Sequence, residues 1–249
     1  MYEFDSKVRY SELAEDKKLS PVSIINYFQD CCTFEAEEKG VGRKVLDKNH
    51  TAWMLINWHI KIDRRPDFNE KIHIKTWACN FRHFIGERNF TITSDDGELL
   101  IYSFSRWAYV DTEKGEPVKS IPKEELDAYG ISEPLDAEFK KGKIKVPGEM
   151  TATDPIKVTA GNLDTNHHVN NGEYMELAMS AVSEYLINEE ADSSVSLNDI
   201  AEIRAEYKLQ SVLGDVIYPY VSMEDKIIYV VLKDDEGNSK LIVELTLSD

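Results

Sequence analysis

The side chains best suited to chemistry lie in one run, Asn162-Leu-Asp-Thr-Asn-His-His-Val-Asn-Asn171. It precedes a predicted helix, and helix N-termini carry unpaired backbone N–H groups and a partial positive charge. An acyl carbonyl placed there would have its developing oxyanion stabilised, by about 3 kcal/mol per donor. Asp164 and His168 could supply a base, or a nucleophile and its acid. The run therefore has the parts of an acyl-transfer site.

Simpler interpretations of the same residues stay open. Asn170 or Asn171 could cap the helix, since asparagine is a favoured N-cap. Asp164-Thr-Asn166 could form an Asx turn. A metal site is the weakest alternative, because the adjacent His167 and His168 point in different directions, whereas zinc pairs on helices favour i, i+4 spacing.

The elements around this run follow from hydrophobic periodicity. In the first half, Ser20 and Pro21 open a helix over 22–39, with Gly40 at its end. Alternating runs then predict strands at 56–62, 72–77, 84–93 and 99–110. The second half predicts a short strand at 156–159, a helix at 171–188, and strands at 203–209, 216–222, 227–232 and 241–247.

The two halves have the same order, which indicates an internal duplication. The turn glycines Gly97 and Gly237 lie 140 residues apart, and the helix residues Tyr27 and Tyr174 lie 147 apart. The first half has Lys18-Leu-Ser-Pro21 where the second has its polar run. A cap needed only for folding should occur in both halves, so this asymmetry favours a function for the run.

A long helix beside antiparallel strands, present twice, predicts an α+β fold in which each sheet curls around its helix. We expect an N-terminal repeat over 1–110, a linker over 111–150 and a C-terminal repeat over 151–249. The linker contains four prolines and a short amphipathic piece at 123–129.

The composition of the chain argues against several classes of function. The net charge of −17 argues against non-specific nucleic-acid binding, which needs a basic surface. No apolar run approaches the roughly 20 residues of a membrane span, and the start of the chain lacks the features of a signal peptide, so we expect a cytoplasmic protein. Cys31, Cys32 and Cys79 are expected to be small buried residues rather than nucleophiles or ligands.

The run resembles the Asp-x-Asn-x-His-Val-Asn-Asn signature of acyl-acyl carrier protein (acyl-ACP) thioesterases, the plant plastid enzymes and their bacterial relatives. The resemblance extends to the strand from Trp53 to Arg64, to Glu70-Lys-Ile-His-Ile-Lys-Thr-Trp77 and to Phe84-Ile-Gly-Glu-Arg-Asn-Phe90. It implies a tandem, or double, hot dog fold whose second repeat is catalytic and whose first helps enclose the acyl chain. It implies no cofactor and no metal.

By this resemblance Asp164, Asn166 and His168 are the catalytic positions. Further candidates for substrate contact are Asn170, Asn171, Trp53, Trp58 and Trp77, although aromatic residues on alternating strands belong more often to the core. The family commonly adds a Glu, often followed by Cys, on the next strand. Here Gln210 and Ser211 stand in their places, so Gln210 is expected to position a water rather than take its proton.

The expected function is hydrolysis of fatty acyl-ACP to the free fatty acid, in fatty acid biosynthesis. Alternatives are an acyl-CoA thioesterase and a non-catalytic acyl-binding protein; a hot dog dehydratase fits the pattern less well. Because acyl carrier protein is acidic, its docking face must be locally basic. Lys140-Lys-Gly-Lys-Ile-Lys145 is the densest candidate, beside the arginines at 64, 65, 82 and 88, and each could equally be a solvated surface group. The protein could be a monomer or a homodimer.

Overall fold

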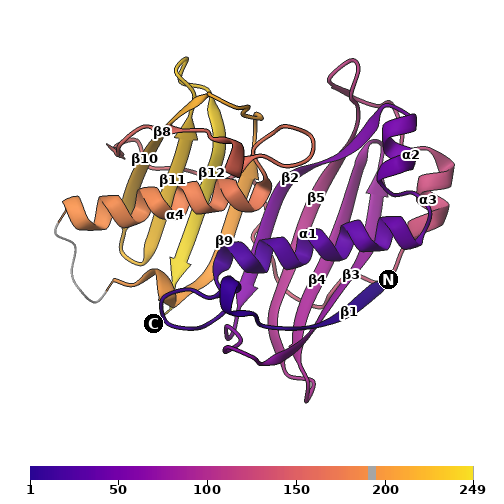
Figure 1. The fold of residues 1–249 in the computed structure, drawn as a ribbon, viewed down its shortest axis with the longest axis horizontal. Helices are drawn as coiled ribbons and strands as arrows, with labels where there is room; N and C mark the ends of the chain where they lie inside the picture. Colours follow the sequence, from indigo (N-terminus) through magenta and orange to yellow (C-terminus); the bar gives the residue numbers. More distant parts are fainter. Residues whose placement is uncertain (190–194, 249) are drawn as a thin grey trace. The chain divides into compact units, whose positions relative to one another are not determined.

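The computed structural model describes residues 1–189 and 195–248. The chain divides into two compact units, Met1–Lys140 and Lys141–Asp249. In each, one long helix lies across an antiparallel sheet (Figure 1). The predicted α+β fold with two hot dog repeats is therefore confirmed. No helix among the described residues is long and apolar enough to cross a membrane.

The first unit has a sheet with the strand order β1-β3-β4-β5-β2, in which every described pairing is antiparallel. The helix α1 (Pro21–Glu38) contacts β1 and β3. The remaining elements are β1 (Tyr2–Lys7), η1 (Tyr10–Glu12), α2 (Arg43–Lys48), β2 (Thr51–Ile62), β3 (Lys71–Arg82), β4 (Ile85–Ser94), β5 (Leu99–Asp111), β6 (Glu116–Pro117) and α3 (Lys123–Tyr129).

The second unit repeats this plan, with the strand order β9-β12-β11-β10-β7 and β8 paired to β10. Its helix α4 (Asn171–Asn188) contacts β10 and β11. The other elements are β7 (Thr151–Ala152), β8 (Ile156–Lys157), η2 (Ala160–Asn162), η3 (Leu197–Asp199), β9 (Ile200–Tyr207), β10 (Val216–Glu224), β11 (Ile227–Lys233) and β12 (Ser239–Leu247).

The two long helices begin in the same way, with a short polar N-cap. The Ser20 hydroxyl accepts a hydrogen bond from Ser23 N at 3.1 Å, and Asn170 Oδ1 accepts one from Gly172 N at 2.8 Å. Both helices have 18 residues, and α4 starts 150 residues after α1. The spacing of 147 residues inferred from Tyr27 and Tyr174 was therefore wrong by three, because it aligned two tyrosines rather than the two caps.

The core of the first unit is aromatic. Phe28 of α1 packs between Trp58 and Phe90, with ring centroids 5.7 and 5.0 Å away, and Trp58 is only 1% exposed. A bulge between Leu55 and Asn57 shifts the register of β2 against β5. Because a bulge inserts one extra residue into a strand, an odd-numbered side chain before it and an even-numbered side chain after it can point to the same face of the sheet.

Residues 111–140, predicted to form most of a linker, pack on the first unit. The strand β6 pairs with β5, and Trp53 Nε1 donates to Glu125 of α3 at 3.4 Å. Trp77 Nε1 donates to the Glu133 carbonyl at 2.8 Å, and the Phe139 ring contacts the His59 ring at a centroid distance of 5.0 Å.

A buried ion pair connects α1 to the sheet of this unit. Glu35 of α1 is completely buried, Arg88 of β4 is 7% exposed, and the two are directly hydrogen bonded. Burial opposes the charge on the guanidinium, but the adjacent Glu35 carboxylate leaves the pKa of Arg88 raised overall. The guanidinium also contacts Thr76 Oγ1 and lies 5.2 Å from the centre of the Tyr129 ring.

Breaking this pair should destabilise the first unit strongly. We expect Arg88→Ala to lower the free energy of unfolding by about 3–5 kcal/mol, because it leaves a buried carboxylate without its main partner. Lys71→Ala, which removes an exposed pair with Asp95, should cost at most about 1 kcal/mol. All four tryptophans belong to the first unit, so urea titration followed by tryptophan fluorescence reports on that unit. Equal losses in the two variants would contradict a special role for the buried pair.

Candidate active site

A tight backbone turn carries the three predicted catalytic residues. Leu163 and Val169 form an antiparallel bridge, and between them Asp164 N donates to the His168 carbonyl at 2.8 Å. His167 N donates to the Asp164 carbonyl at 3.1 Å, and His167 has a left-handed backbone with φ of 62°. The turn holds Asp164, Asn166 and His168 on five consecutive residues, just before α4.

The Asp164 carboxylate faces back into the turn. Its Oδ1 accepts hydrogen bonds from Asn166 N at 2.7 Å and from His168 N at 3.2 Å, while Asn166 Nδ2 lies 3.5 Å from Oδ2. The local geometry is that of an Asx turn, so this structural interpretation holds for the Asp164 Oδ1 atom. Asp164 and His168 are partly buried, whereas Asn166 and His167 are exposed.

The first unit contains the same turn without these side chains. Leu13 and Leu19 form the corresponding bridge, Ala14 N donates to the Lys18 carbonyl at 2.8 Å, and Lys17 has φ of 67°. Ala14 occupies the position of Asp164, so the backbone turn forms without a carboxylate. The first half lacks the polar run, as its sequence shows, but the inference that this asymmetry argues against a structural role was wrong, since cap and turn occur in both units. What differs is the set of side chains on the turn.

Other polar residues of the run build the scaffold. The Asn162 side chain accepts a hydrogen bond from Thr159 N, at the start of the short helix η2, at 2.9 Å. The Asn162 carbonyl accepts a hydrogen bond from Asn170 N at 2.9 Å. Asn170 is the N-cap of α4, as the capping alternative predicted. The Asn171 carbonyl accepts from the Tyr207 hydroxyl at 3.0 Å. Asn162 and Asn170 therefore have structural roles, because their polar atoms hold the turn and the start of α4 in place.

The loop after β9 is hydrogen bonded to the residue that follows His168. Val169 N donates to the Ser211 carbonyl at 3.0 Å, and this bond places Ser211 and its neighbour Gln210 beside the turn. Gln210 is exposed, and its carbonyl accepts from Lys240 Nζ at 3.1 Å. The structure thus brings Gln210 into the same loop cluster as His168, three residues beyond β9 rather than on a strand.

Two buried hydroxyl groups lie near this loop, those of Tyr174 and Ser211; the sequence marked Ser211 only as the residue in place of the family's Cys. Burial raises the pKa of Tyr174 to about 12, and its hydroxyl donates to the Leu209 carbonyl at 3.1 Å. Ser211 is 1% exposed, and its Oγ has no hydrogen bond of good geometry within the described residues. The sequence showed Tyr174 only as a member of the apolar helix face, which hides the role of its hydroxyl.

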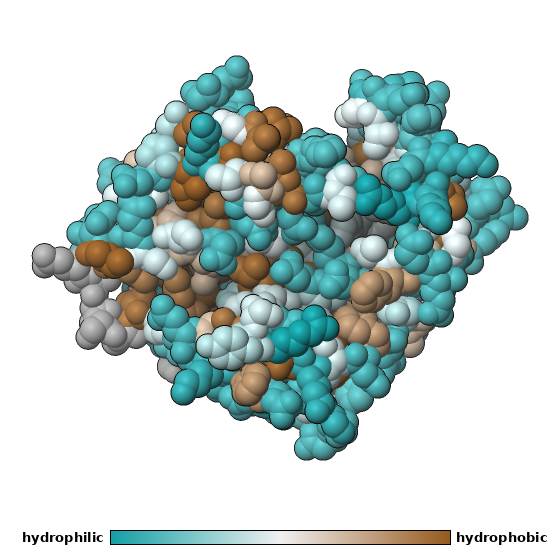
Figure 2. Space-filling model, in the orientation of Figure 1, coloured by the Kyte–Doolittle hydropathy of each residue, from teal (hydrophilic) through white to brown (hydrophobic). Residues whose placement is uncertain are grey.

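The same loop exposes apolar side chains. Leu209, Val212 and Leu213 are 48, 45 and 61% exposed. Figure 2 shows apolar residues gathered over the end of the second unit where α4 begins. Exposed apolar surface next to polar groups is typical of a binding site for a ligand with an apolar part.

The three tryptophans proposed for substrate contact occupy different environments in the first unit. Trp58 is enclosed by aromatic rings, and Trp77 is 7% exposed with its Nε1 atom hydrogen bonded. Trp53 is partly exposed and contacts the Tyr109 ring at a centroid distance of 4.8 Å. Trp58 and Trp77 are core residues in this structure, and contact of all three with an acyl chain stays a prediction.

The thiols are poorly suited to nucleophilic attack. Cys31 is completely buried, and Cys32 and Cys79 are partly buried; all three are free. Burial raises the pKa of Cys32 and of Cys79 to about 11. Since the thiolate is the nucleophile, these groups are protonated and unreactive at neutral pH.

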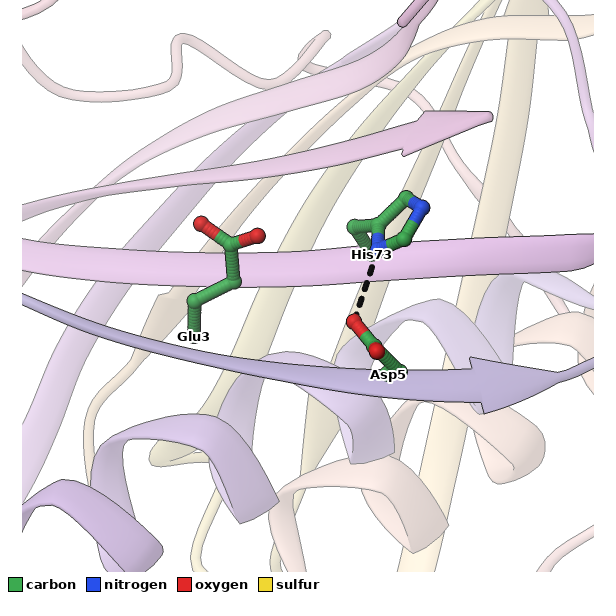
Figure 3. A group of neighbouring side chains, drawn as sticks. All are labelled: Glu3, Asp5 and His73. Carbon is green, nitrogen blue, oxygen red and sulfur yellow. Dashed lines mark hydrogen bonds and ion pairs between the residues drawn. The ribbon is translucent and has the colours of Figure 1, made fainter. Parts of the chain in front are cut away.

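One group of possible metal ligands occurs in the described residues, and it belongs to the first unit. Glu3 and Asp5 of β1 and His73 of β3 offer ligand atoms that all lie within 4.8 Å of one another (Figure 3). Asp5 already binds His73 Nδ1 at 2.7 Å, and Glu3 pairs with Lys75 at 3.4 Å. A nearby lysine disfavours a cation, so we interpret the group as a cross-strand ion-pair cluster.

This cluster should titrate measurably. The hydrogen bond to Asp5 raises the pKa of His73, and the carboxylates of Asp95 and Glu3 act in the same direction. The stabilisation is therefore present below the ordinary histidine pKa and is lost as the pH rises through the raised value. By NMR titration, Asp5→Asn should lower the His73 pKa more than Asp95→Asn does. An unchanged pKa in Asp5→Asn would exclude this pair as the cause.

Comparison with known proteins supports the sequence resemblance. The acyl-ACP thioesterase N-terminal domain matches residues 1–129, and the acyl-ACP thioesterase C-terminal domain matches residues 147–244. Among curated relatives, the chloroplastic dodecanoyl-[acyl-carrier-protein] hydrolase of Cinnamomum camphora is 23% identical over 220 residues, covering 83% of this chain and 56% of its own length. The chloroplastic oleoyl-acyl carrier protein thioesterase 1 of Arabidopsis thaliana is 24% identical over 228 residues, 84% of this chain and 60% of its own. The chain spans a little over half the length of these relatives.

Solved structures show the same fold over the whole chain. An acyl-ACP thioesterase from Bacteroides thetaiotaomicron superposes with a TM-score of 0.83 at 20% identity, covering 99% of this chain and 97% of its own. The 12:0-ACP thioesterase from Umbellularia californica also gives 0.83, at 18% identity, with 99% and 96% covered. Both matched domains occur here in order and together account for most of the sequence. The chain therefore belongs to the acyl-ACP thioesterase family.

Proposed function

We propose that this protein hydrolyses the thioester of fatty acyl-ACP and releases the free fatty acid, as part of fatty acid biosynthesis. The observation that carries the proposal is the placement of Asp164, Asn166 and His168 on the turn before α4. The equivalent turn of the first unit lacks all three side chains, and membership of the thioesterase family supports the assignment.

The reaction needs a site for the thioester carbonyl next to a group that can move protons. The start of α4 supplies backbone N–H donors and the positive end of an 18-residue helix, both of which stabilise an oxyanion. An oxygen nucleophile, water or the Asp164 carboxylate, adds to the carbonyl carbon, the carbon–sulfur bond breaks, and the leaving thiolate takes a proton; where Asp164 attacks, water then hydrolyses the anhydride. His168 can serve both proton transfers, because a neutral imidazole nitrogen accepts a proton and the protonated ring donates one.

Asp164 and Asn166 would complete the site. One Asp164 oxygen is engaged by backbone N–H groups, while Oδ2 receives, from the residues that the structure describes, the longer contact of Asn166 alone. That second oxygen is the atom we assign either to attack on the thioester or to activation of water. Single-turnover hydrolysis in oxygen-18 water tests for the first, because an anhydride opened by water at the aspartyl carbonyl leaves label in the Asp164 carboxylate, whereas activated water labels only the fatty acid.

We also assign Gln210 to the positioning of water, with the buried Ser211 hydroxyl beside it. This assignment is supported by the hydrogen bond from Val169 N to the Ser211 carbonyl, which holds the loop next to the turn. Glutamine orients water through its amide but takes no proton, so the base must come from Asp164 or His168.

Removing either proposed proton-transfer group should abolish most of the activity without unfolding the protein. We expect Asp164→Asn and His168→Ala each to lower kcat for acyl-ACP at least ~100-fold. The matched control is His167→Asn, which alters the exposed neighbouring histidine and keeps a residue that tolerates the left-handed backbone. It should retain at least about half of the wild-type kcat, since adjacent turn residues point in different directions. Near-normal turnover in Asp164→Asn or His168→Ala would defeat the assignment.

The identity of the carrier separates the main function from its alternatives. For one acyl chain, we expect kcat/KM to be at least about tenfold higher on acyl-ACP than on acyl-CoA, because a carrier protein adds contacts outside the site. The reverse preference would identify an acyl-CoA thioesterase. Tight binding of acyl-ACP with no turnover would identify an acyl-binding protein. The cytoplasmic location and the choice between monomer and homodimer stay predictions.

A further inference from the structure

A lysine-rich segment at the start of the second unit concentrates positive charge in a strongly acidic protein. Lys141, Lys143 and Lys145 are all exposed, and none forms an ion pair with any residue the structure describes. Three other cations of this unit are neutralised: Arg204 by Glu244, Lys208 by Glu206 and Lys240 by Asp234. Three lysines without ion pairs in five residues concentrate positive charge that an anionic partner could neutralise.

The segment is nevertheless held in a defined position. Ile144, between the lysines, is 7% exposed, and its N–H donates to the Glu206 carboxylate at 2.7 Å. Arg204 Nη2 donates to the Gly142 carbonyl at 2.9 Å. A merely solvated loop needs neither a buried anchor nor two hydrogen bonds from one strand. These contacts fix where the three ammonium groups are presented.

The strand that holds the lysines also leads to the candidate active site. Glu206 of β9 binds the lysine segment, and the next residue, Tyr207, donates from the opposite side of the strand to the carbonyl of Asn171, where α4 begins. Successive side chains of a strand point to opposite faces. The lysines and the start of α4 therefore lie on the two faces of the same end of β9, and the loop that contains Ser211 follows directly.

We propose that Lys141, Lys143 and Lys145 form the docking surface for the acidic carrier protein that delivers the acyl chain; this rests on the proposed function. With a net charge of −17, most of the surface repels an acidic partner. An anchored group of unpaired cations reverses the field locally, which raises the association rate and selects the orientation of the partner. The thioester sits on a long flexible arm of the carrier protein, so docking on the outer face of β9 leaves the arm free to reach the start of α4.

The test is the variant Lys141→Glu/Lys143→Glu/Lys145→Glu, compared with Lys44→Glu/Lys119→Glu/Lys123→Glu. The control changes three exposed lysines of the first unit, for which the structure shows no ion pair, and shifts the net charge by the same amount. For acyl-ACP, we expect kcat/KM of the docking variant to fall at least tenfold below that of the control, mainly through KM, with a weaker dependence on salt. Hydrolysis of the same acyl chain on N-acetylcysteamine, which lacks the carrier protein, should be equal in both.

Binding of a fluorescently labelled bacterial holo-acyl carrier protein, followed by anisotropy, gives a readout that does not need turnover. The Kd should rise at least tenfold in the docking variant relative to the control. A Kd and a KM within twofold of the control would overturn the docking surface, even if hydrolysis of acyl-ACP is normal. A different outcome is that the wild-type protein binds the carrier protein but hydrolyses no thioester, and that the docking variant loses this binding. That outcome would support the docking surface and reject the proposed function.

Discussion

Two backbone hydrogen bonds across the turn at 164–168 set the positions of Asp164, Asn166 and His168. Asp164 and His168 pair through the main chain, and His167 closes the turn by adopting a left-handed conformation. The cap of α4 and the bond from Val169 to Ser211 then attach this turn to the helix and to the loop after β9. The chemistry depends on these bonds because a displacement of about 1 Å is enough to impair a catalytic group.

The duplication separates what the turn needs for folding from what it has for function. The first unit forms the same bridge, the same turn and the same type of cap with Ala14 and Lys18 in place of Asp164 and His168. The common backbone is therefore scaffold, and the side chains of the second turn are the addition. In the first unit, polar side chains serve packing instead: Asp16 of the equivalent turn binds the buried Arg65. One backbone thus supports a structural ion pair in one unit and a candidate active site in the other.

Much of this arrangement was predictable from residue patterns. The caps, Pro21 and the 3.6-residue periodicity located both long helices, and the turn glycines Gly97 and Gly237 located two strand junctions. The repeat spacing was not predicted correctly, because loops of different length in the two halves give different offsets and tyrosines are poor markers of register. The equivalence of the two turns was also missed, since backbone hydrogen bonds leave no trace in side-chain identity. The buried Glu35–Arg88 pair and the anchored lysines depend on contacts between residues distant in sequence, which periodicity does not report.

Exchange of the turn side chains tests the central claim most directly. Replacing residues 164–168 with the sequence of residues 14–18 transfers Ala, Glu, Asp, Lys and Lys onto a backbone that accepts them in the first unit. The account predicts a folded protein whose free energy of unfolding, measured by urea titration with far-UV circular dichroism, changes by no more than about 1 kcal/mol, the scale of a surface substitution. Its hydrolysis of acyl-ACP should fall to the background rate. Hydrolysis that persists at the wild-type rate in the folded variant would contradict the account.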